Sequence, residues 1–137
     1  MPLPYIDEHS QRITGTPDTV WAAVSKVLRK TMGGSARFAR ILGCDPVTST
    51  TAFAGLPGET VPGFRVVDAD DHRLELRGRH RFSNYALTFV LDGDQLRAQT
   101  HAEFPGILGS LYRTAVIRTG FHRLATRRLL RQMARAA

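Results

Sequence analysis

The chain has 137 residues with a hydrophobic content of 42% and a charged content of 23%, ordinary values for a globular protein that exclude a disordered chain. Because this length suits one domain with one core, we expect a single domain over residues 1–137. The formal net charge is +7, and the sequence after Glu103 contains no acidic residue. The excess charge therefore belongs to seven C-terminal arginines: Arg113, Arg118, Arg123, Arg127, Arg128, Arg131 and Arg135.

The cysteine content and the N-terminus indicate the cellular compartment. Cys44 is the single cysteine, so it cannot form a disulfide within the chain, and we expect a buried, unreactive thiol. The first residues lack the basic and apolar regions of a secretion signal, and no run has the length and apolar character of a membrane-spanning helix. We therefore expect a cytoplasmic protein without a transmembrane segment.

The N-terminal part predicts one strand followed by two helices. Residues 5–13 have mixed polarity and end near Gly15, which is typical of a strand near the edge of a sheet. Thr16-Pro17-Asp18 combines a capping hydroxyl, a proline suited to the first helical position and a carboxylate near the positive end of the helix dipole. Apolar residues then recur at helical spacing up to Gly33-Gly34. Ser35 is expected to cap a second, short helix that ends near Gly43.

The hydrophobic period changes to two between Pro46 and Phe104, which predicts a β-sheet. A turn over residues 68–71 separates two strands, and residues 73–81 alternate between an apolar and a basic face. The strands that follow are joined by a hairpin at Asp92-Gly93. Successive strands with one apolar face are typical of an antiparallel sheet that is covered on one side.

After Pro105-Gly106, residues 107–135 predict one long amphipathic helix. Its apolar stripe consists of Leu108, Leu111, Ala115, Thr119, His122, Thr126, Leu129 and Met133. Six of the seven arginines lie on or near the opposite side. A sheet with one apolar face and a helix to cover it predicts a two-layer α+β domain.

Three short motifs resemble those of a known superfamily. Pro17-Asp18-Thr19-Val20-Trp21 is similar to the P-x-x-V-W opening of the first helix in bacterial members, and Gly78-Arg79-His80-Arg81-Phe82 and Pro105-Gly106 support the match. Together with the order of elements over nearly the whole chain, they resemble the START-related superfamily, also called SRPBCC, which includes birch-pollen allergens and polyketide cyclases. The segment from Gly109 to Leu130 is also similar to an actinobacterial branch.

The resemblance implies a helix-grip fold: a curved antiparallel sheet wrapped around a long C-terminal helix, with two short helices after the first strand. Members bind lipids, sterols, polyketides or plant hormones between the sheet and that helix, and a minority catalyse cyclisation or dehydration. The resemblance therefore implies binding or carriage of a small, largely apolar ligand, such as a lipid, a fatty acid or a polyketide-like molecule, without a cofactor. No catalytic motif of a studied member matches residue by residue, so no catalytic residue is assigned.

Polar residues that face inward are candidates to orient a ligand in an apolar pocket. His80 and Tyr85 share the inward phase of the sheet, and Tyr112, Arg118 and His122 lie on or beside the helical stripe. Each has a structural alternative, because a histidine on an apolar face is more often hydrogen-bonded within the protein, and a buried tyrosine is more often a core residue. The predicted apolar walls are Leu74, Leu76, Leu87, Phe89, Leu96, Ala98, Leu111 and Ala115.

Arg118 requires a partner, since an unpaired guanidinium is costly to bury. It would reach solvent, pair with a carboxylate such as Asp7 or Glu59, or bind the anionic group of a ligand. In the last case a fatty acid or another apolar acid becomes the expected ligand.

Two other classes of function remain open. A cyclase or dehydratase would use His122 or His80 as general acid/base and Arg118 or Tyr112 to polarise a carbonyl. The five histidines are scattered and no H-x-x-x-H or cysteine pair occurs, so no metal site is predicted.

The basic C-terminal helix could instead contact a protein, a membrane or a nucleic acid. A nucleic acid is disfavoured because no helix-turn-helix, RNP or zinc pattern occurs. Ile117, Phe121 and Leu124 lie among the arginines on the side away from the sheet. There they would pack under the short helices or the N-terminal segment, form a homodimer interface or enter an anionic membrane surface. Among the functional options we favour the homodimer.

Overall fold

The computed structural model describes residues 3–34, 36–118 and 120–137, with the side chain of Arg118 left out. The chain begins with β1 (Tyr5–Arg12), α1 (Pro17–Gly33) and α2 (Ala36–Leu42). The strands β2 (Thr60–Val61), β3 (Phe64–Ala69), β4 (Arg73–His80), β5 (Ser83–Asp92) and β6 (Gln95–Glu103) follow. The C-terminal part consists of α3 (Gly106–Arg113), the π-helix η1 (Thr114–Arg118) and α4 (Phe121–Ala136).

The described strands form one antiparallel sheet with the order β1-β6-β5-β4-β3-β2. The strand predicted over residues 5–13 is confirmed as an edge strand, β1, paired with β6. The hairpin between β5 and β6 is also present, but Asp92 pairs with Gln95, so Gly93 and Asp94 form the turn instead of Asp92 and Gly93. Gly93 has a φ of +59°, a conformation that glycine adopts without strain.

The signals at the start of α1 act as predicted. The side-chain oxygen of Thr16 accepts a hydrogen bond from the backbone N–H of Thr19 at 3.3 Å, Pro17 is the first helical residue, and Asp18 lies in the first turn. The Trp21 indole N–H donates to the carbonyl of Asp71 at 2.7 Å, which ties α1 to the turn between β3 and β4. Ser35, the expected cap of α2, lies outside the described residues.

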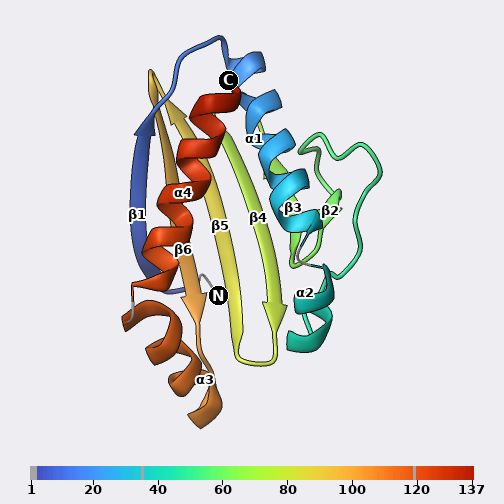
Figure 1. Ribbon diagram of the computed structural model, residues 1–137, viewed down its shortest axis with the longest axis vertical. Helices are drawn as coiled ribbons and strands as arrows, with labels where there is room; N and C mark the ends of the chain where they lie inside the picture. The colour runs from blue at the N-terminus through green and yellow to red at the C-terminus, as the bar shows by residue number, and fades with distance from the viewer. Residues whose placement is uncertain (1–2, 35, 119) are drawn as a thin grey trace.

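The helices α1 and α4 cover the same face of the sheet, and α3 extends beyond its end (Figure 1). The core lies between these two layers. Its most deeply buried side chains include Val24 and Leu28 of α1, Leu76, Phe89 and Leu96 of the sheet, and Leu130 and Met133 of α4. The α+β helix-grip fold predicted from the sequence is therefore confirmed. None of the described helices combines the length and apolar character needed to cross a bilayer.

The single long helix predicted over residues 107–135 is wrong in one respect: the chain changes direction before α4. Gly120 has a φ of +77°, in the left-handed region that ends a right-handed helix, and η1 precedes it. Thr126, Leu129 and Met133 of the predicted stripe are buried, whereas Leu108 and Leu111 are exposed; Thr119 lies outside the described residues. The stripe holds only in α4 because α3 does not continue along the sheet.

Candidate functional site

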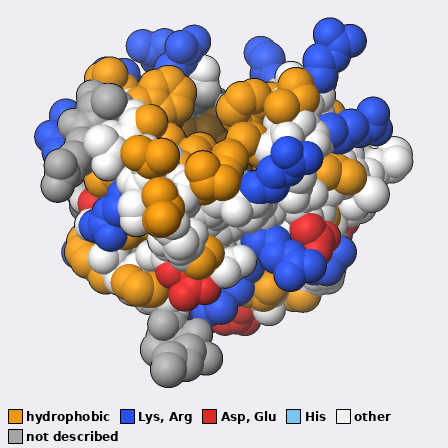
Figure 2. Space-filling view, turned by 90° about the horizontal axis from the view of Figure 1, so that it is seen from below, with side chains coloured by type: hydrophobic (Ala, Val, Ile, Leu, Met, Phe, Trp, Pro, Cys, Tyr) orange, Lys and Arg blue, Asp and Glu red, His pale blue; other side chains and the backbone are white. Residues whose placement is uncertain are grey.

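A cavity of about 350 Å³ lies at the end of the sheet that α4 leaves uncovered. It is open on one side and is lined by β4, β5, β6 and the residues around the β2–β3 turn, and by the C-terminal end of α1, α2, and the segment from α3 into α4. Figure 2 shows it as a hollow between hydrophobic side chains. Its volume falls within the range of small-molecule sites. Its apolar lining includes Met32, Ala39, Leu42, Phe64, Leu87, Ala102, Phe104, Val116, Ile117, Ala125 and Leu129.

Tyr85 lies in the wall with its hydroxyl engaged. The hydroxyl donates to the carbonyl of Gly63 at 2.6 Å, and Gly78, the cross-strand partner of Tyr85, leaves room for the ring. A Cβ at position 78 would collide with that same carbonyl and lie 2.9 Å from the ring of Tyr85. Burial, with an added contribution from Cys44, raises the pKa of Tyr85, so its phenol stays protonated. Tyr85 therefore has a structural partner of its own.

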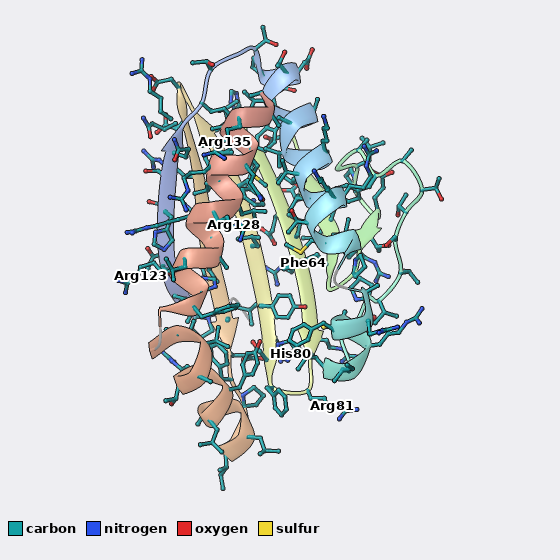
Figure 3. The ribbon with its side chains drawn as sticks, viewed as in Figure 1. Phe64, His80, Arg81, Arg123, Arg128 and Arg135 are labelled. Atoms are coloured by element: carbon teal, nitrogen blue, oxygen red, sulfur yellow. The ribbon has the colours of Figure 1, made fainter. Side chains whose placement is uncertain are left out.

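His80 of β4 and Tyr112 of α3 bring two neighbouring polar groups to the cavity. Their rings meet edge to face with centroids 4.8 Å apart, and Tyr112 also stacks on Phe82 at 5.4 Å. Phe64 and His80 lie between the C-terminal helices on one side and α1 and α2 on the other (Figure 3). The rings form a continuous aromatic wall that fixes both polar groups in place.

The protonation of these two groups follows from their surroundings. Nδ1 of His80 accepts a hydrogen bond from the backbone N–H of Phe82 at 3.1 Å, so the neutral ring carries its proton on Nε2. Burial lowers the pKa of His80, which favours that neutral form. Burial raises the pKa of the Tyr112 phenol. Within the described part of the chain, neither Nε2 of His80 nor the Tyr112 hydroxyl has a hydrogen-bond partner, so both can meet a ligand.

His122 lines the cavity, but one ring nitrogen is held by the sheet. Its Nε2 lies 3.1 Å from Oγ1 of Thr100 and 3.3 Å from Oδ1 of Asp7, and the other oxygen of Asp7 lies 3.1 Å from Nε2 of His9. These contacts join the start of α4 to β6 and to the edge strand β1. These partners support a structural role for His122, in which the ring holds α4 against the sheet.

The two carboxylates suggested as partners of Arg118 are engaged elsewhere. Asp7 lies between the two histidines, and the Glu59 carboxylate accepts the backbone N–H groups of Ala54 at 3.0 Å and Leu56 at 2.9 Å. The side chain of Arg118 lies outside the described residues. Its predicted contact with a ligand stays a prediction.

The structure separates the predicted site residues into three groups. His80, Tyr85, Tyr112, His122 and Leu87 line the cavity, and their contact with a ligand stays a prediction. The predicted walls Leu74, Leu76, Phe89, Leu96 and Ala98 belong to the packed core instead. Leu111 and Ala115 are exposed and lie outside the lining. The chain bends at Gly120, and before this bend Tyr112 and Val116 face the cavity in their place.

Several lining residues were missed from the sequence. Cys44 follows α2 and faces the cavity, where burial raises the pKa of its thiol. Met32 and Leu42 come from the ends of α1 and α2, and Phe104 from the end of β6. The signal that could have revealed this arrangement is Thr119-Gly120 inside a helical pattern, since an internal glycine marks a potential break. Among the described residues, no cluster of three His, Cys, Asp or Glu side chains could hold a metal ion.

Comparisons with known proteins identify the fold. No protein-family model matches the chain, and no curated protein matches its sequence. Protein CV1439 from Chromobacterium violaceum is 15% identical over 96% of both chains, with a TM-score of 0.57. Mll3558 from Rhizobium loti is 16% identical over 93% of this chain and 90% of its own, with a TM-score of 0.51. MLL2253 from Mesorhizobium loti is 9% identical over 95% and 94%, with a TM-score of 0.53. At these identities the structures share a fold, and function has to be argued from the site.

Proposed function

We propose that residues 1–137 act as one START-like domain that binds or carries a small, largely apolar ligand, such as a lipid or a polyketide-like molecule, in the cavity between the sheet and the C-terminal helices. The observation that carries this proposal is the cavity of about 350 Å³ with its mainly apolar lining. Burial of ligand surface would supply most of the affinity, at roughly 25 cal/mol per Å² before the costs of association.

The polar groups in the wall indicate which functional groups the ligand contains. Nε2 of His80 and the Tyr112 hydroxyl are neutral donors, and Tyr85 is already bonded to Gly63. Two neutral donors suit a carbonyl or hydroxyl oxygen on an otherwise apolar molecule. A fatty acid would additionally need Arg118, so Arg118→Leu should weaken the binding of fatty acids more than that of neutral analogues. Equal losses would remove Arg118 from ligand recognition.

Native mass spectrometry of the purified chain, followed by solvent extraction and identification of released molecules, tests the proposal. We expect an apolar adduct, or a thermal shift with members of a lipid and polyketide panel. Ala125→Trp adds a bulky side chain at the cavity and should abolish the adduct. Ala22→Trp, at an exposed helical position outside the lining, should retain it. No adduct and no thermal shift across the panel would contradict a ligand-binding function.

Catalysis in the same pocket is the second candidate function. A neutral imidazole beside a protonated phenol, with ring centroids 4.8 Å apart, favours it. Such a pair could move a proton and polarise a carbonyl in a cyclisation or dehydration. His80→Gln and Tyr112→Phe should then each abolish turnover of a polyketide-like substrate while ligand binding persists. Turnover that is unchanged in both variants would leave binding as the function.

A further inference from the structure

The end of the molecule that contains the cavity exposes an unusual amount of apolar surface. On α3 and the start of α4, the exposed apolar side chains are Ile107, Leu108, Leu111, Phe121 and Leu124, each between 62% and 82% exposed. On the other side of the cavity, α2 adds Phe38 and Ile41, which are 61% and 65% exposed. We call these seven residues the apolar rim. Figure 2 shows hydrophobic side chains on both sides of the hollow.

The apolar rim is continuous with the wall of the cavity. Phe38 belongs to both, since it lines the cavity and is 61% exposed. The helix α3 extends beyond the sheet and meets the rest of the protein through Gly109 and Tyr112, which lie against Phe82 and Phe104, so its outer apolar residues have no core to join. Large apolar side chains that are gathered on a surface mark an interaction site.

The charges around the apolar rim have one sign. The helices α2, α3 and α4 and the π-helix η1 contain no acidic residue, and Arg37, Arg40, Arg113 and Arg123 project from them. Figure 2 shows Lys and Arg side chains at the edge of the hollow, with acidic side chains on the other half of the view. Within the described part of the chain, none of these four arginines forms an ion pair with a carboxylate.

Most arginines of the strands behave differently, because they pair with carboxylates. Arg12 pairs with Asp94 at 3.2 Å, Arg79 with Asp45 at 3.3 Å, and Arg97 with Asp92 at 2.7 Å. Arg73 and Arg77 both pair with Glu75. Among the described residues, arginines without a carboxylate partner therefore surround the apolar rim, although Arg113 also lies over the ring of Phe104 at 5.6 Å. Further arginines continue from there along α4.

We infer that this end of the protein docks on a bilayer surface rich in anionic phospholipids. The apolar rim enters the boundary between headgroups and acyl chains, and the surrounding arginines pair with lipid phosphates. The opening of the cavity then faces the membrane. A second copy of this chain fits the surface less well, because a symmetric contact would set arginines against arginines with no carboxylate between them. This inference goes beyond the proposed ligand binding and does not depend on it.

Vesicle co-flotation of the full chain tests the inference. One set of vesicles contains only phosphatidylcholine, and the other contains phosphatidylcholine and phosphatidylglycerol in equal amounts. We expect binding to the anionic vesicles, weaker binding as salt is added, and little binding to the neutral ones. No binding to anionic vesicles at low salt would overturn the inference.

Two pairs of variants test the surface itself. Ile107→Ser combined with Leu108→Ser should weaken vesicle binding at least about tenfold, because both side chains lose apolar surface. The matched control combines Leu56→Ser with Val67→Ser, which are 59% and 46% exposed on the loop before β2 and on β3. It should bind as the unmodified chain does. Equal binding by the two double variants would exclude the apolar rim as the docking surface.

The contribution of the arginines to vesicle binding is tested with a separate pair of double variants. Arg113→Gln combined with Arg123→Gln should weaken binding roughly fivefold for each arginine at low salt. Arg128→Gln combined with Arg135→Gln removes the same charge further along α4, towards the C-terminus (Figure 3), and should have the smaller effect. Equal losses in the two pairs would mean that only net charge matters and would contradict docking through this end.

A further measurement distinguishes the membrane from a second copy. Sedimentation of the unmodified chain should show a monomer over a range of concentrations. A concentration-dependent dimer that the Ile107 and Leu108 substitutions abolish would show an interface between copies instead. Circular dichroism and thermal unfolding confirm that each variant is folded. Loss of vesicle binding by a folded variant that still carries its adduct separates this inference from the proposed ligand binding.

Discussion

At the scale of single residues, the cavity wall depends on Gly78, because the absence of a side chain there leaves room for Tyr85. Tyr85 reaches the carbonyl of Gly63 because its ring lies over Gly78 in the neighbouring strand. A glycine inside a strand weakens the sheet locally, yet here it allows the aromatic ring and the backbone to approach closely. The alternation of apolar and basic residues in β4 gives no indication of this contact.

Gly78→Ala should lower the free energy of unfolding by about 1–3 kcal/mol, the cost that is typical of overpacking. The added Cβ would meet a backbone carbonyl, which cannot move aside as a flexible side chain would. The control is Gly33→Ala, where nothing lies within 4 Å of an added Cβ at the end of α1. Urea unfolding of the two variants checks the difference, and equal stabilities would contradict the packing described for Tyr85.

The stability of the protein should depend on the protonation of His80. Because burial lowers its pKa below the ordinary value of 6.5, the unfolded chain binds a proton at this site more readily than the folded chain does. The contribution of His80 is therefore complete above pH 6.5 and is lost as the pH falls below that value. Protonation of Nδ1 would also break its bond with the Phe82 N–H.

His80→Asn should remove this part of the acid sensitivity, because an amide oxygen can accept from Phe82 without titrating. The matched control is His72→Asn, an exposed histidine in the turn between β3 and β4. Urea unfolding above and below pH 6.5 measures the effect. If His80→Asn loses as much stability on acidification as the unmodified chain, burial of His80 is not the cause.

At the scale of elements, the break before α4 determines which residues surround the cavity. If one straight helix continued through residue 120, the predicted stripe would place Leu111 and Ala115 on the sheet. Instead Tyr112, Val116 and Ile117 face the cavity, while Phe121 and Leu124 are exposed. The expectation that Ile117, Phe121 and Leu124 share one outer side is therefore met by Phe121 and Leu124 only.

Gly120→Ala should destabilise the fold by about 1–2 kcal/mol, because alanine is strained in the left-handed region. The change isolates backbone strain, since an added Cβ at this position meets nothing within 4 Å. Asparagine tolerates the left-handed conformation, so Gly120→Asn is the matched control and should cost less. Thermal unfolding compares the two variants. A smaller cost for alanine than for asparagine would contradict the conformation of Gly120.

At the scale of the whole molecule, packing and charge divide the protein into two unlike ends. The core joins α1 and α4 to the sheet, whereas α3 contacts the end of the sheet, at Phe82 and Phe104, and is largely exposed. Ion pairs are concentrated on the sheet, and the C-terminal helices carry arginines without acidic neighbours in the same helices. The cavity and most of the exposed large apolar side chains thus occur together at one end, and the positive charge of the C-terminal helices extends from there along α4.

Hydrogen–deuterium exchange should follow this division. Amides in the central strands β4, β5 and β6 should exchange most slowly, because they are paired on both sides and covered by the core. Amides in α3 should exchange much faster than those in α4, since opening α3 exposes little buried apolar surface. Mass spectrometry of peptic fragments measures both. Equal protection of α3 and α4 would contradict the weak packing of α3.

The sequence by itself determined the elements whose signals are local. Thr16, Pro17 and Asp18 define the start of α1, and alternation between residues 73 and 104 defines the antiparallel strands. The same periodicity identified His80, Tyr85 and Leu87 as facing inward, because the phase of a strand is read from neighbouring residues, whereas it placed Tyr112 only beside the predicted helical stripe.

The tertiary structure alone decided which inward-facing residues surround a cavity and which fill the core. Leu76 and Phe89 have the same phase in the sheet as residues at the cavity, but α1 and α4 pack over them and leave no space. Cys44, Met32 and Phe104 come together from segments far apart in the chain. The physical reason is that the direction of the C-terminal segment, set by the backbone at Gly120, fixes where the helical layer ends, and a periodic pattern holds no information about that direction.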